Sequence, residues 1–500
     1  MSQVPDHIKL MKPPSSEVQK IKGHYYVYSV KGKYNKVLKK SVSVRMGCIG
    51  KIYDGIGFVP NNKGRQNSIC VTKEYGASRV VLVLTERLLA KIRKHFSSEF
   101  LRIYILSSLK LLEKDLTLNR IDCSYERSAL SLLLPEVHLS KNTVRDFIEK
   151  LSLRRGEMIA FMKEYHVSEG GHIIFDGTSM LSASKDNPYC EKGYTPGKKN
   201  MTQIRLIYAF EIETRMPVYF NVVPGNISDM TALVCSFNDL GLKNCVMVLD
   251  NGFFSDFNIK SMLYTKGMTF ILPLKDNTAL VNAEYKPFIA YKGVIENNFT
   301  YHNRFVFYRE LECKKYEGCR IFIYYDERRN KDLEKEKLKK ARSLHGDKIP
   351  KELVSNLHKE CEMLGVTMLL TNNKSDAEQT YLDYKARWAI EEMFDTMKNT
   401  LSFTMNYEAG YQTQMGWAFI EFVSLLMYYE INKVLTEKGL YKNYSCGDVL
   451  YELKTIEQSN CNADGKWMLA NITKKKEELL KTLGVSLELI TKNPDYADSR

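Results

Sequence analysis

The run YLDYKARWAIEEMFDTMKNT, residues 381–400, separates charged from apolar side chains along one predicted helix. At about 100° per residue, four polar side chains share a sector of about 60°, namely Tyr384, Arg387, Glu391 and Lys398. The neighbouring sector is apolar and can be buried, and it contains Ile390, Met393, Phe394 and Met397. The run therefore predicts a docked helix that presents one carboxylate beside two cations and a phenol.

Such a stripe has the groups that a metal-dependent phosphodiester site needs. The carboxylate can hold Mg²⁺, while the cations and the phenol can hold DNA phosphates. An ordinary amphipathic helix with solvated charges would show the same pattern. The choice between the two interpretations depends on whether further acidic motifs lie elsewhere in the chain.

Two such motifs lie upstream, and each places an aspartate after a buried strand. In GHIIFDGTS, the apolar run 172–175 reads as a strand that Asp176 closes, with a turn beginning at Gly177. In NCVMVLDNGFFS, the strand 246–249 ends at Asp250 before an Asn-Gly turn. Either motif alone is weak, because many strands end at such turns.

Together the three motifs resemble the insertion-sequence-four family of bacterial DDE transposases. The spacing of tyrosine, arginine, glutamate and lysine in residues 384–398 is the pattern of this family. The upstream motifs are similar to its Asp-x-Thr and Asp-x-Gly-aromatic motifs, and the matching residues are Asp176, Thr178, Asp250, Gly252 and Phe253. The resemblance implies an acidic triad of Asp176, Asp250 and Glu391.

The resemblance also implies a mechanism. The triad would hold two Mg²⁺ or Mn²⁺ ions for phosphoryl transfer on DNA, without a covalent enzyme–DNA intermediate. Tyr384, Arg387, Lys398 and Thr178 would contact the DNA phosphates. Asp395, one turn after Glu391, is an alternative ligand or a partner of the ligands, but only Glu391 fits the family spacing.

The fold expected from the resemblance is α/β, with a ribonuclease-H-like core. Further strands are predicted at 204–212, 217–223 and 269–274, with a helix that Ser228 caps. In a core of this kind the first and fourth strands are neighbours, which would bring Asp176 and Asp250 together. The catalytic helix would follow a β-rich insertion.

The chain of 500 residues is long enough for several domains. Residues 1–85 are predicted to form an N-terminal β-rich module, with strands at 24–30, 40–44 and 80–84. The remaining expected divisions are a helical region at 86–168, the first part of the core at 169–274, the insertion at 275–365, the second part of the core at 366–436 and a C-terminal helical region at 437–500.

The helical region contains a candidate for DNA-end binding. Pro135 separates two helical runs, and Ser140 can cap a second helix bearing Lys141 and Arg145, as in a helix-turn-helix. A plain helical bundle explains the same pattern equally well. Lys198 and Lys199, in the long loop after Asp176, are further candidates for contact with the DNA backbone, and a solvated hairpin is the alternative.

The insertion combines two predicted strands, at 303–311 and 320–326, with a charged helical stretch at 328–364. Members of the family that form DNA hairpins use tryptophans of this insertion to stack on a flipped base. No tryptophan occurs between residues 275 and 365. The chain departs from the family pattern in this respect. Tyr301, Phe305, Phe307 and Tyr308 could stack on a flipped base instead, or they could belong to the core, so the resemblance leaves open whether a hairpin intermediate forms.

Composition agrees with a polyanionic partner and an intracellular location. Lys and Arg number 73 against 59 Asp and Glu, a net charge of +14. The eleven cysteines form no C-x-x-C pair, and we expect no secretory segment and no membrane span. A bacterial cytoplasmic protein associated with the nucleoid is expected.

The sequence thus predicts a transposase that acts as a homodimer on double-stranded DNA, at the transposon ends and at the target. It is expected to move DNA by cleavage and strand transfer, with cut-and-paste as the favoured route. Two alternatives remain. The first is a metal-dependent nuclease without strand transfer, which a joining assay would distinguish. The second is a non-catalytic DNA-binding derivative, against which the complete acidic triad counts.

Overall fold

The computed structural model falls into two compact units, one of residues 1–72 with 458–469 and one of residues 73–457 with 470–500. Each unit is described by itself. The described residues are 4–35, 40–61, 71–135, 137–165, 170–182, 184, 187–192, 201–265, 267–274, 281, 294, 296–346, 364–402, 410–460 and 467–487.

The first unit contains a four-stranded antiparallel sheet in the order β1-β2-β3-β4. Its small core is formed by Val27, Ile52 and Ile8, the last from the short helix α1 (Asp6–Leu10). The strands predicted at 24–30 and 40–44 are confirmed within longer strands. The bounds are Ser16–Ile21 for β1, His24–Asn35 for β2, Lys40–Tyr53 for β3 and Gly57–Pro60 for β4.

The strand predicted at 80–84 is wrong, because these residues belong to helix α2 (Gly76–Leu84). The β-branched run suggested a strand, but Val80, Val81 and Leu82 are buried inside a group of helices, where packing overrides local propensity. Gly76 allows this packing, since a Cβ there would lie 2.3 Å from the carbonyl oxygen of Leu453 in helix α17.

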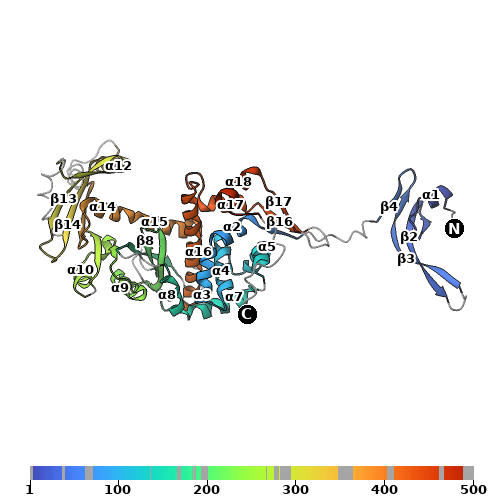
Figure 1. Cartoon of the computed structure of the whole chain (residues 1–500), viewed down its shortest axis with the longest axis horizontal. Helices are drawn as coiled ribbons and strands as arrows, with labels where there is room; N and C mark the ends of the chain where they lie inside the picture. The colour runs from blue at the N-terminus through green and yellow to red at the C-terminus, as the bar shows by residue number, and fades with distance from the viewer. Residues whose placement is uncertain are drawn as a thin grey trace. The chain divides into compact units, whose positions relative to one another are not determined.

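The long helix α16 (Tyr411–Glu437) runs through the helical part of the second unit (Figure 1). It contacts α2, α4, α7 and α17, and on another side strand β9. Gly416 permits a close approach to α7, because a Cβ there would lie 2.3 Å from the Ile148 carbonyl oxygen. The other helices are α3 (Glu86–His95), α4 (Phe100–Leu112), α5 (Ile121–Arg127), α6 (Leu130–Leu133), α7 (Lys141–Ser152), α8 (Arg155–Met162), α17 (Cys446–Leu453) and α18 (Lys474–Leu483).

The region expected to be a C-terminal helical segment also contributes two short strands. β16 and β17 form a three-stranded sheet with β5, in the order β17-β16-β5. The bounds are Val71–Glu74 for β5, Glu457–Asn460 for β16 and Met468–Ala470 for β17.

The second unit also contains a ten-stranded mixed sheet, in the order β12-β13-β14-β15-β11-β10-β6-β8-β7, with β9 also paired to β8. The predicted core strands are all present. Their bounds are His172–Leu181 for β6, Thr202–Glu211 for β8, Met216–Pro224 for β9, Val246–Val248 for β10 and Thr269–Pro273 for β11. The short strand β7 (Glu191–Lys192) was not predicted and lies in the expected long loop after Asp176.

The middle of this sheet has the strand order expected of a ribonuclease-H-like core. β6 pairs antiparallel with β8, and β8 pairs antiparallel with β9. On its other side β6 pairs parallel with β10, and β10 pairs parallel with β11. The expected contact between the first and fourth core strands is therefore confirmed.

Helices connect these core strands, and the helix that Ser228 caps lies where it was predicted. Ser228 caps α9 (Asp229–Leu240) by accepting a hydrogen bond from the Thr231 backbone N–H. Ser255 caps α10 (Asp256–Lys260) in the same way, and a π-helical turn, η3 (Ser261–Thr265), follows. α9 contacts β9 and β6, so it lies against the core strands.

The predicted strands of the insertion extend the same sheet. β13 (Arg304–Glu312) pairs with β12 (Asn298–Tyr301) and β14 (Arg320–Asp326). β14 then pairs with β15 (Val366–Thr371), which also pairs with β11. The charged helix α12 spans Glu327–His345, and residues 347–363 of the predicted helical stretch lie outside the described residues. No helix in the described part of the chain is both long and apolar enough to cross a membrane.

Glu421 in α16 gives a testable link between this core and pH. The side chain is 2% exposed, lies 3.8 Å from the Lys110 ammonium, and has its pKa raised to about 7 by burial, which Lys110 only partly offsets. The folded state holds the Glu421 proton more tightly than the unfolded state does. The free energy of unfolding should therefore fall as the pH rises from about 5 to about 7. The loss attributable to Glu421 is about 2–3 kcal/mol.

Glu421→Gln should remove this part of the pH dependence, measured by denaturant unfolding at several pH values. Some dependence should remain, because burial also raises the pKa of Glu430 to about 7. Glu437→Gln, at an exposed position of the same helix, is the control. An unchanged pH profile in Glu421→Gln would contradict the prediction.

Candidate active site

The parallel pairing of β6 with β10 places two aspartates at matching positions. Ile174 is the register partner of Val248. Asp176 and Asp250 each follow two residues later. Because parallel strands carry residues of equal offset side by side, the two carboxylates lie next to each other just beyond the paired residues of β6 and β10.

The two aspartates differ in their local structure. Asp250 follows its strand as predicted and caps a 3₁₀ turn, η2 (Asn251–Phe253), by accepting a hydrogen bond from the Asn251 backbone N–H at 2.7 Å. Asp176 does not end its strand. β6 continues to Leu181, and Asp176 pairs with Tyr208 of β8. The predicted turn at Gly177 is wrong because β8 supplies a partner for each of these residues.

The predicted helix at 381–400 is three helical segments in succession. α14 (Ala377–Ala386) ends at Arg387, where hydrogen bonds between residues three apart tighten the chain, and α15 (Trp388–Asp395) follows. A π-helical turn, η4 (Thr396–Thr400), completes the run. The predicted apolar face is confirmed, since Ile390, Met393, Phe394 and Met397 are buried.

Arg387 joins the three predicted catalytic acids. One guanidinium nitrogen, Nη2, donates to Glu391 Oε1 at 2.6 Å. The other, Nη1, lies 3.7 Å from Asp250 Oδ1 and 4.0 Å from Asp176 Oδ2. The arginine side chain is 19% exposed, whereas that of Glu391 is 50% exposed. Acids far apart in sequence therefore converge on one cation.

The remaining residues of the polar stripe lie at the same place. Lys398 donates a hydrogen bond from its ammonium to Thr178 Oγ1 at 2.5 Å. Burial lowers the pKa of Lys398, and the nearby Asp176 carboxylate opposes this shift. Burial also raises the pKa of the Tyr384 phenol, with Arg387 lowering it and Asp250 and Glu391 among the groups that raise it. These three side chains thus lie within electrostatic reach of the acids.

The three carboxylates have the chemistry of a divalent-metal site. Carboxylate oxygens are the preferred ligands of Mg²⁺ and Mn²⁺, and here three of them converge on a single positive group. Within the described residues, no three His, Cys, Asp or Glu side chains are gathered closely enough to form a ready ion site. The guanidinium of Arg387 lies among the acids and supplies positive charge there.

A histidine bridge that sequence analysis missed fixes the approach of α14. His172, the first residue of β6, lies 2.8 Å from Glu213 through Nδ1 and 3.0 Å from Asp383 through Nε2. Burial lowers the pKa of His172. The hydrogen bonds to Asp383 and Glu213 raise this pKa by a larger amount, so the net shift is upward. Asp383 directly precedes Tyr384, so the bridge ties the strand of Asp176 to the helix that leads to Arg387.

Trp388 is a second feature that sequence analysis missed. It follows Arg387 directly, and it is 65% exposed. Large aromatic side chains are usually well buried. A helical wheel places Trp388 near the polar stripe of Tyr384, and this position could have indicated from the sequence that the side chain is exposed.

The other predicted DNA-binding residues do not join this site. Ser140 caps α7 as predicted, and Lys141 and Arg145 are exposed, the latter 3.5 Å from Glu149. Neither makes a recorded contact with the acids within the described chain. Lys198 and Lys199 lie outside the described residues.

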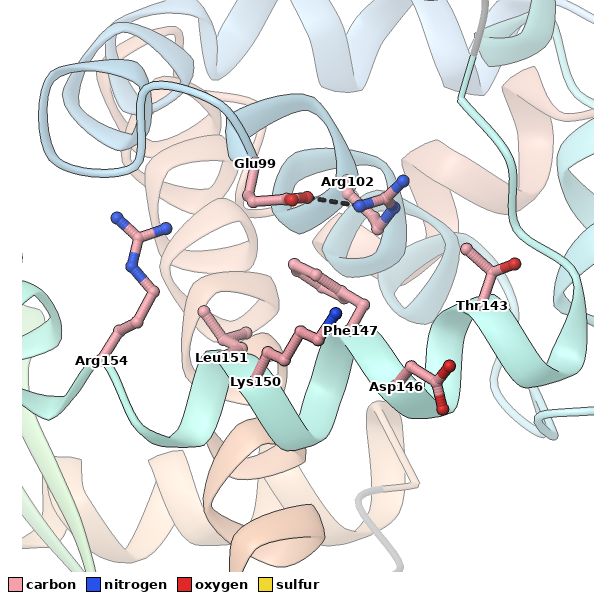
Figure 2. Close-up of a pocket in the computed structure, with 8 residues that line it drawn as sticks. All are labelled: Glu99, Arg102, Thr143, Asp146, Phe147, Lys150, Leu151 and Arg154. Atoms are coloured by element: carbon pink, nitrogen blue, oxygen red, sulfur yellow. Dashed lines mark hydrogen bonds and ion pairs between the residues drawn. The ribbon is translucent and has the colours of Figure 1, made fainter.

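The same helix lines a pocket of about 240 Å³ (Figure 2). Its wall mixes cations with acids, and Arg102 is paired with Glu99. A wall of mixed charge does not single out DNA as its ligand. The lining residues are Glu99, Arg102, Thr143, Asp146, Phe147, Lys150, Leu151 and Arg154.

Comparison with known proteins adds a family assignment. Residues 168–427, just over half of the chain, match the family described as transposase DDE domain. Among solved structures, the chain is similar to a piggyBac transposase in a synaptic complex with hairpin DNA, with 12% sequence identity over 84% of this chain and 87% of that chain and a TM-score of 0.40. No curated protein matches the sequence.

Proposed function

Because the chain belongs to the transposase DDE domain family, whose members cleave DNA by phosphoryl transfer, we propose that it cuts and joins DNA at the ends of a mobile element. The observation that carries this proposal is the convergence of Asp176, Asp250 and Glu391 on one cation. The same three residues are the acids that the family motifs select in the sequence.

Asp176, Asp250 and Glu391 would hold the divalent ions. Bound there, Mg²⁺ or Mn²⁺ would activate the attacking oxygen and stabilise the leaving oxygen of the phosphodiester. The 24%, 39% and 50% exposure of the three side chains leaves the acids accessible to DNA from solvent. Two ions are proposed because this family carries out DNA cleavage and joining as in-line displacements.

The neighbouring side chains would orient the DNA. Lys398 and Thr178 would bind a phosphate beside Asp176, which their mutual hydrogen bond supports. Tyr384 remains a neutral phenol, because burial raises its pKa, and can donate a hydrogen bond to a phosphate oxygen. The exposed indole of Trp388 offers a surface on which a base can stack.

The finer assignment is to the insertion-sequence-four family of bacterial elements. It rests on the Tyr384, Arg387, Glu391 and Lys398 spacing and on a ribonuclease-H-like core interrupted by an insertion. We propose that two copies act together, one on each terminal inverted repeat, by a cut-and-paste route in the bacterial cytoplasm. Lys141 and Arg145 on the exposed face of α7 are candidates for contact with the repeat, as are Lys198 and Lys199.

A cleavage and joining assay tests the proposal. The substrate is a plasmid carrying the coding sequence with its natural flanking DNA, incubated with purified protein and Mg²⁺. The proposal requires metal-dependent breaks at both element ends and their insertion into a second plasmid. Cleavage without joined products would favour a nuclease, and binding without cleavage would favour a non-catalytic derivative.

Lys398→Met should weaken DNA binding through the loss of one phosphate contact. The slope of log K against log salt should become smaller in magnitude by roughly 1. The measurement is fluorescence anisotropy with a labelled duplex across a salt series in EDTA. Lys243→Met is the control, because Lys243 is exposed and precedes β10 at the end of the strand opposite to Asp250. Equal slopes in Lys398→Met and wild type would assign Lys398 to folding instead.

A further inference from the structure

A second group of cations lies beside Tyr384 and comes from three separate elements. Arg304 begins β13, Arg329 lies in the first turn of α12, and Lys385 lies near the end of α14. Arg304, Arg329 and Asp326, the residue that caps α12, all act electrostatically on Lys385. The insertion and the catalytic helix thus contribute to one positively charged cluster.

The acid in this cluster is already occupied. Asp326 is 2% exposed, and its Oδ1 accepts a hydrogen bond from the Arg329 backbone N–H at 2.9 Å. Its Oδ2 lies 3.2 Å from Arg304 Nη1. The nearby Glu327 carboxylate is also engaged, since Lys331 donates to it at 2.6 Å. Both carboxylates named here are therefore engaged by other groups, and neither pairs with Lys385.

Lys385 is the cation left without an anion. Within the described residues its ammonium makes no recorded ion pair or hydrogen bond, and it lies over the rings of Tyr381 and Tyr384, at 4.8 and 5.9 Å from their centroids. The pKa of Lys385 is lowered to about 8, chiefly by burial and also by Arg329 and Arg304, against the opposing effect of Asp326. A bound anion would relieve this repulsion.

The cluster is close to the acidic triad. Tyr384 lies within the electrostatic influence of Arg329 and also of Asp250, Arg387 and Glu391. Arg329 is exposed, and the Arg304 side chain is 28% exposed, so a ligand can reach the group from solvent. A polyanion bound at the acids therefore passes near these cations.

We propose that Arg304, Arg329 and Lys385 form a second phosphate site, which holds the DNA backbone next to the cleavage position. The inference rests on the proposed function, because it takes the ligand to be duplex DNA. Guanidinium groups and an ammonium are the side chains that bind phosphate most strongly. Free polyphosphates carry the same chemistry, and the test below separates them from DNA.

Lys385→Met and Lys385→Arg test the site in the full chain, with a labelled duplex of mixed sequence in EDTA. Methionine keeps the contact with the two tyrosine rings but removes the charge, so the salt slope should fall by roughly 1. Arg329→Gln, at an exposed position, should lower it by a similar amount without affecting folding. Lys243→Met should leave the slope unchanged.

A pH series gives a readout that a purely structural role would not change. If DNA restores the usual lysine pKa, Lys385 takes up a proton on binding, and wild-type affinity should fall about tenfold between pH 7 and pH 9. Lys385→Arg should bind as wild type at pH 7 and lose this dependence, because arginine does not titrate in this range.

Several outcomes would overturn the inference. Identical salt slopes and pH profiles in wild type, Lys385→Met and Arg329→Gln, with Lys398→Met still altered, would remove the second site and leave the proposed function standing. A wild-type chain that binds no DNA would remove both. Displacement of the duplex by pyrophosphate at matched ionic strength, in wild type but not in Lys385→Met, would reassign the site to free polyphosphates.

Discussion

Asp176→Asn, Asp250→Asn and Glu391→Gln should each abolish DNA cleavage while leaving DNA binding intact. Each amide keeps the size of the side chain but removes the negative charge that a divalent ion requires. A rate loss of at least about a thousandfold is expected, which corresponds to about 4 kcal/mol in the barrier. Cleavage should be measured on element ends with Mg²⁺, and binding on the same DNA in EDTA.

Asp395→Asn is the matched control for these three variants. Asp395 lies on the same helix as Glu391, but its carboxylate accepts a hydrogen bond from the Asn399 side chain at 2.6 Å and makes no recorded contact with Arg387. The control should cleave DNA at a rate close to wild type. An inactive Asp395→Asn together with an active Glu391→Gln would move the third acid to Asp395.

Arg387→Met should make the chain bind divalent metal more tightly and cleave DNA less well. The guanidinium occupies the space among the three carboxylates, so it competes with a cation for them. Its removal should increase Mn²⁺ affinity without DNA by about 10- to 100-fold, or about 1.5–3 kcal/mol. In the wild type, bound metal would displace Arg387 from the carboxylates, and the freed guanidinium would then orient a phosphate. The variant lacks this group, so cleavage should fall by at least about a hundredfold.

Calorimetry or electron paramagnetic resonance with Mn²⁺ measures the first effect, and the element-end assay measures the second. Arg120→Met, which removes an exposed arginine before α5, controls for the loss of one positive charge. Because the carboxylates hold Arg387 when metal is absent, DNA binding in EDTA should change little. Weaker Mn²⁺ binding in Arg387→Met would show that the arginine arranges the acids and does not compete for them.

The parts of the fold that local pattern determines were predictable. Asp250 follows an apolar run and precedes an Asn-Gly turn, so the end of its strand could be recognised from the sequence. Asp176 could not be placed in the same way, because its strand continues only where β8 pairs with it. The run at Val80–Leu84 was misassigned because burial on all sides, which the sequence does not reveal, favours a helix there.

The candidate site was predictable as a set of residues but not as an arrangement. Helical spacing identified Tyr384, Arg387, Glu391 and Lys398, yet the tight turn at Arg387 and the π-helical turn at Lys398 depend on tertiary packing. The bridge from His172 to Asp383 joins residues that are far apart in sequence. No local pattern records such a contact.

The third acid reaches the sheet from a part of the chain that is synthesised after the first two. Asp176 and Asp250 are in place once β10 has paired with β6. Glu391 comes later in the chain, after β15, which pairs with β11 through Thr371 and Ile271. A ribosome adding about 5–20 residues per second needs about 7 to 28 seconds to pass from Asp250 to Glu391. During that interval, and in any product truncated before α15, the nascent chain carries two of the three proposed metal ligands, so we expect it to be unable to cut the DNA that encodes it.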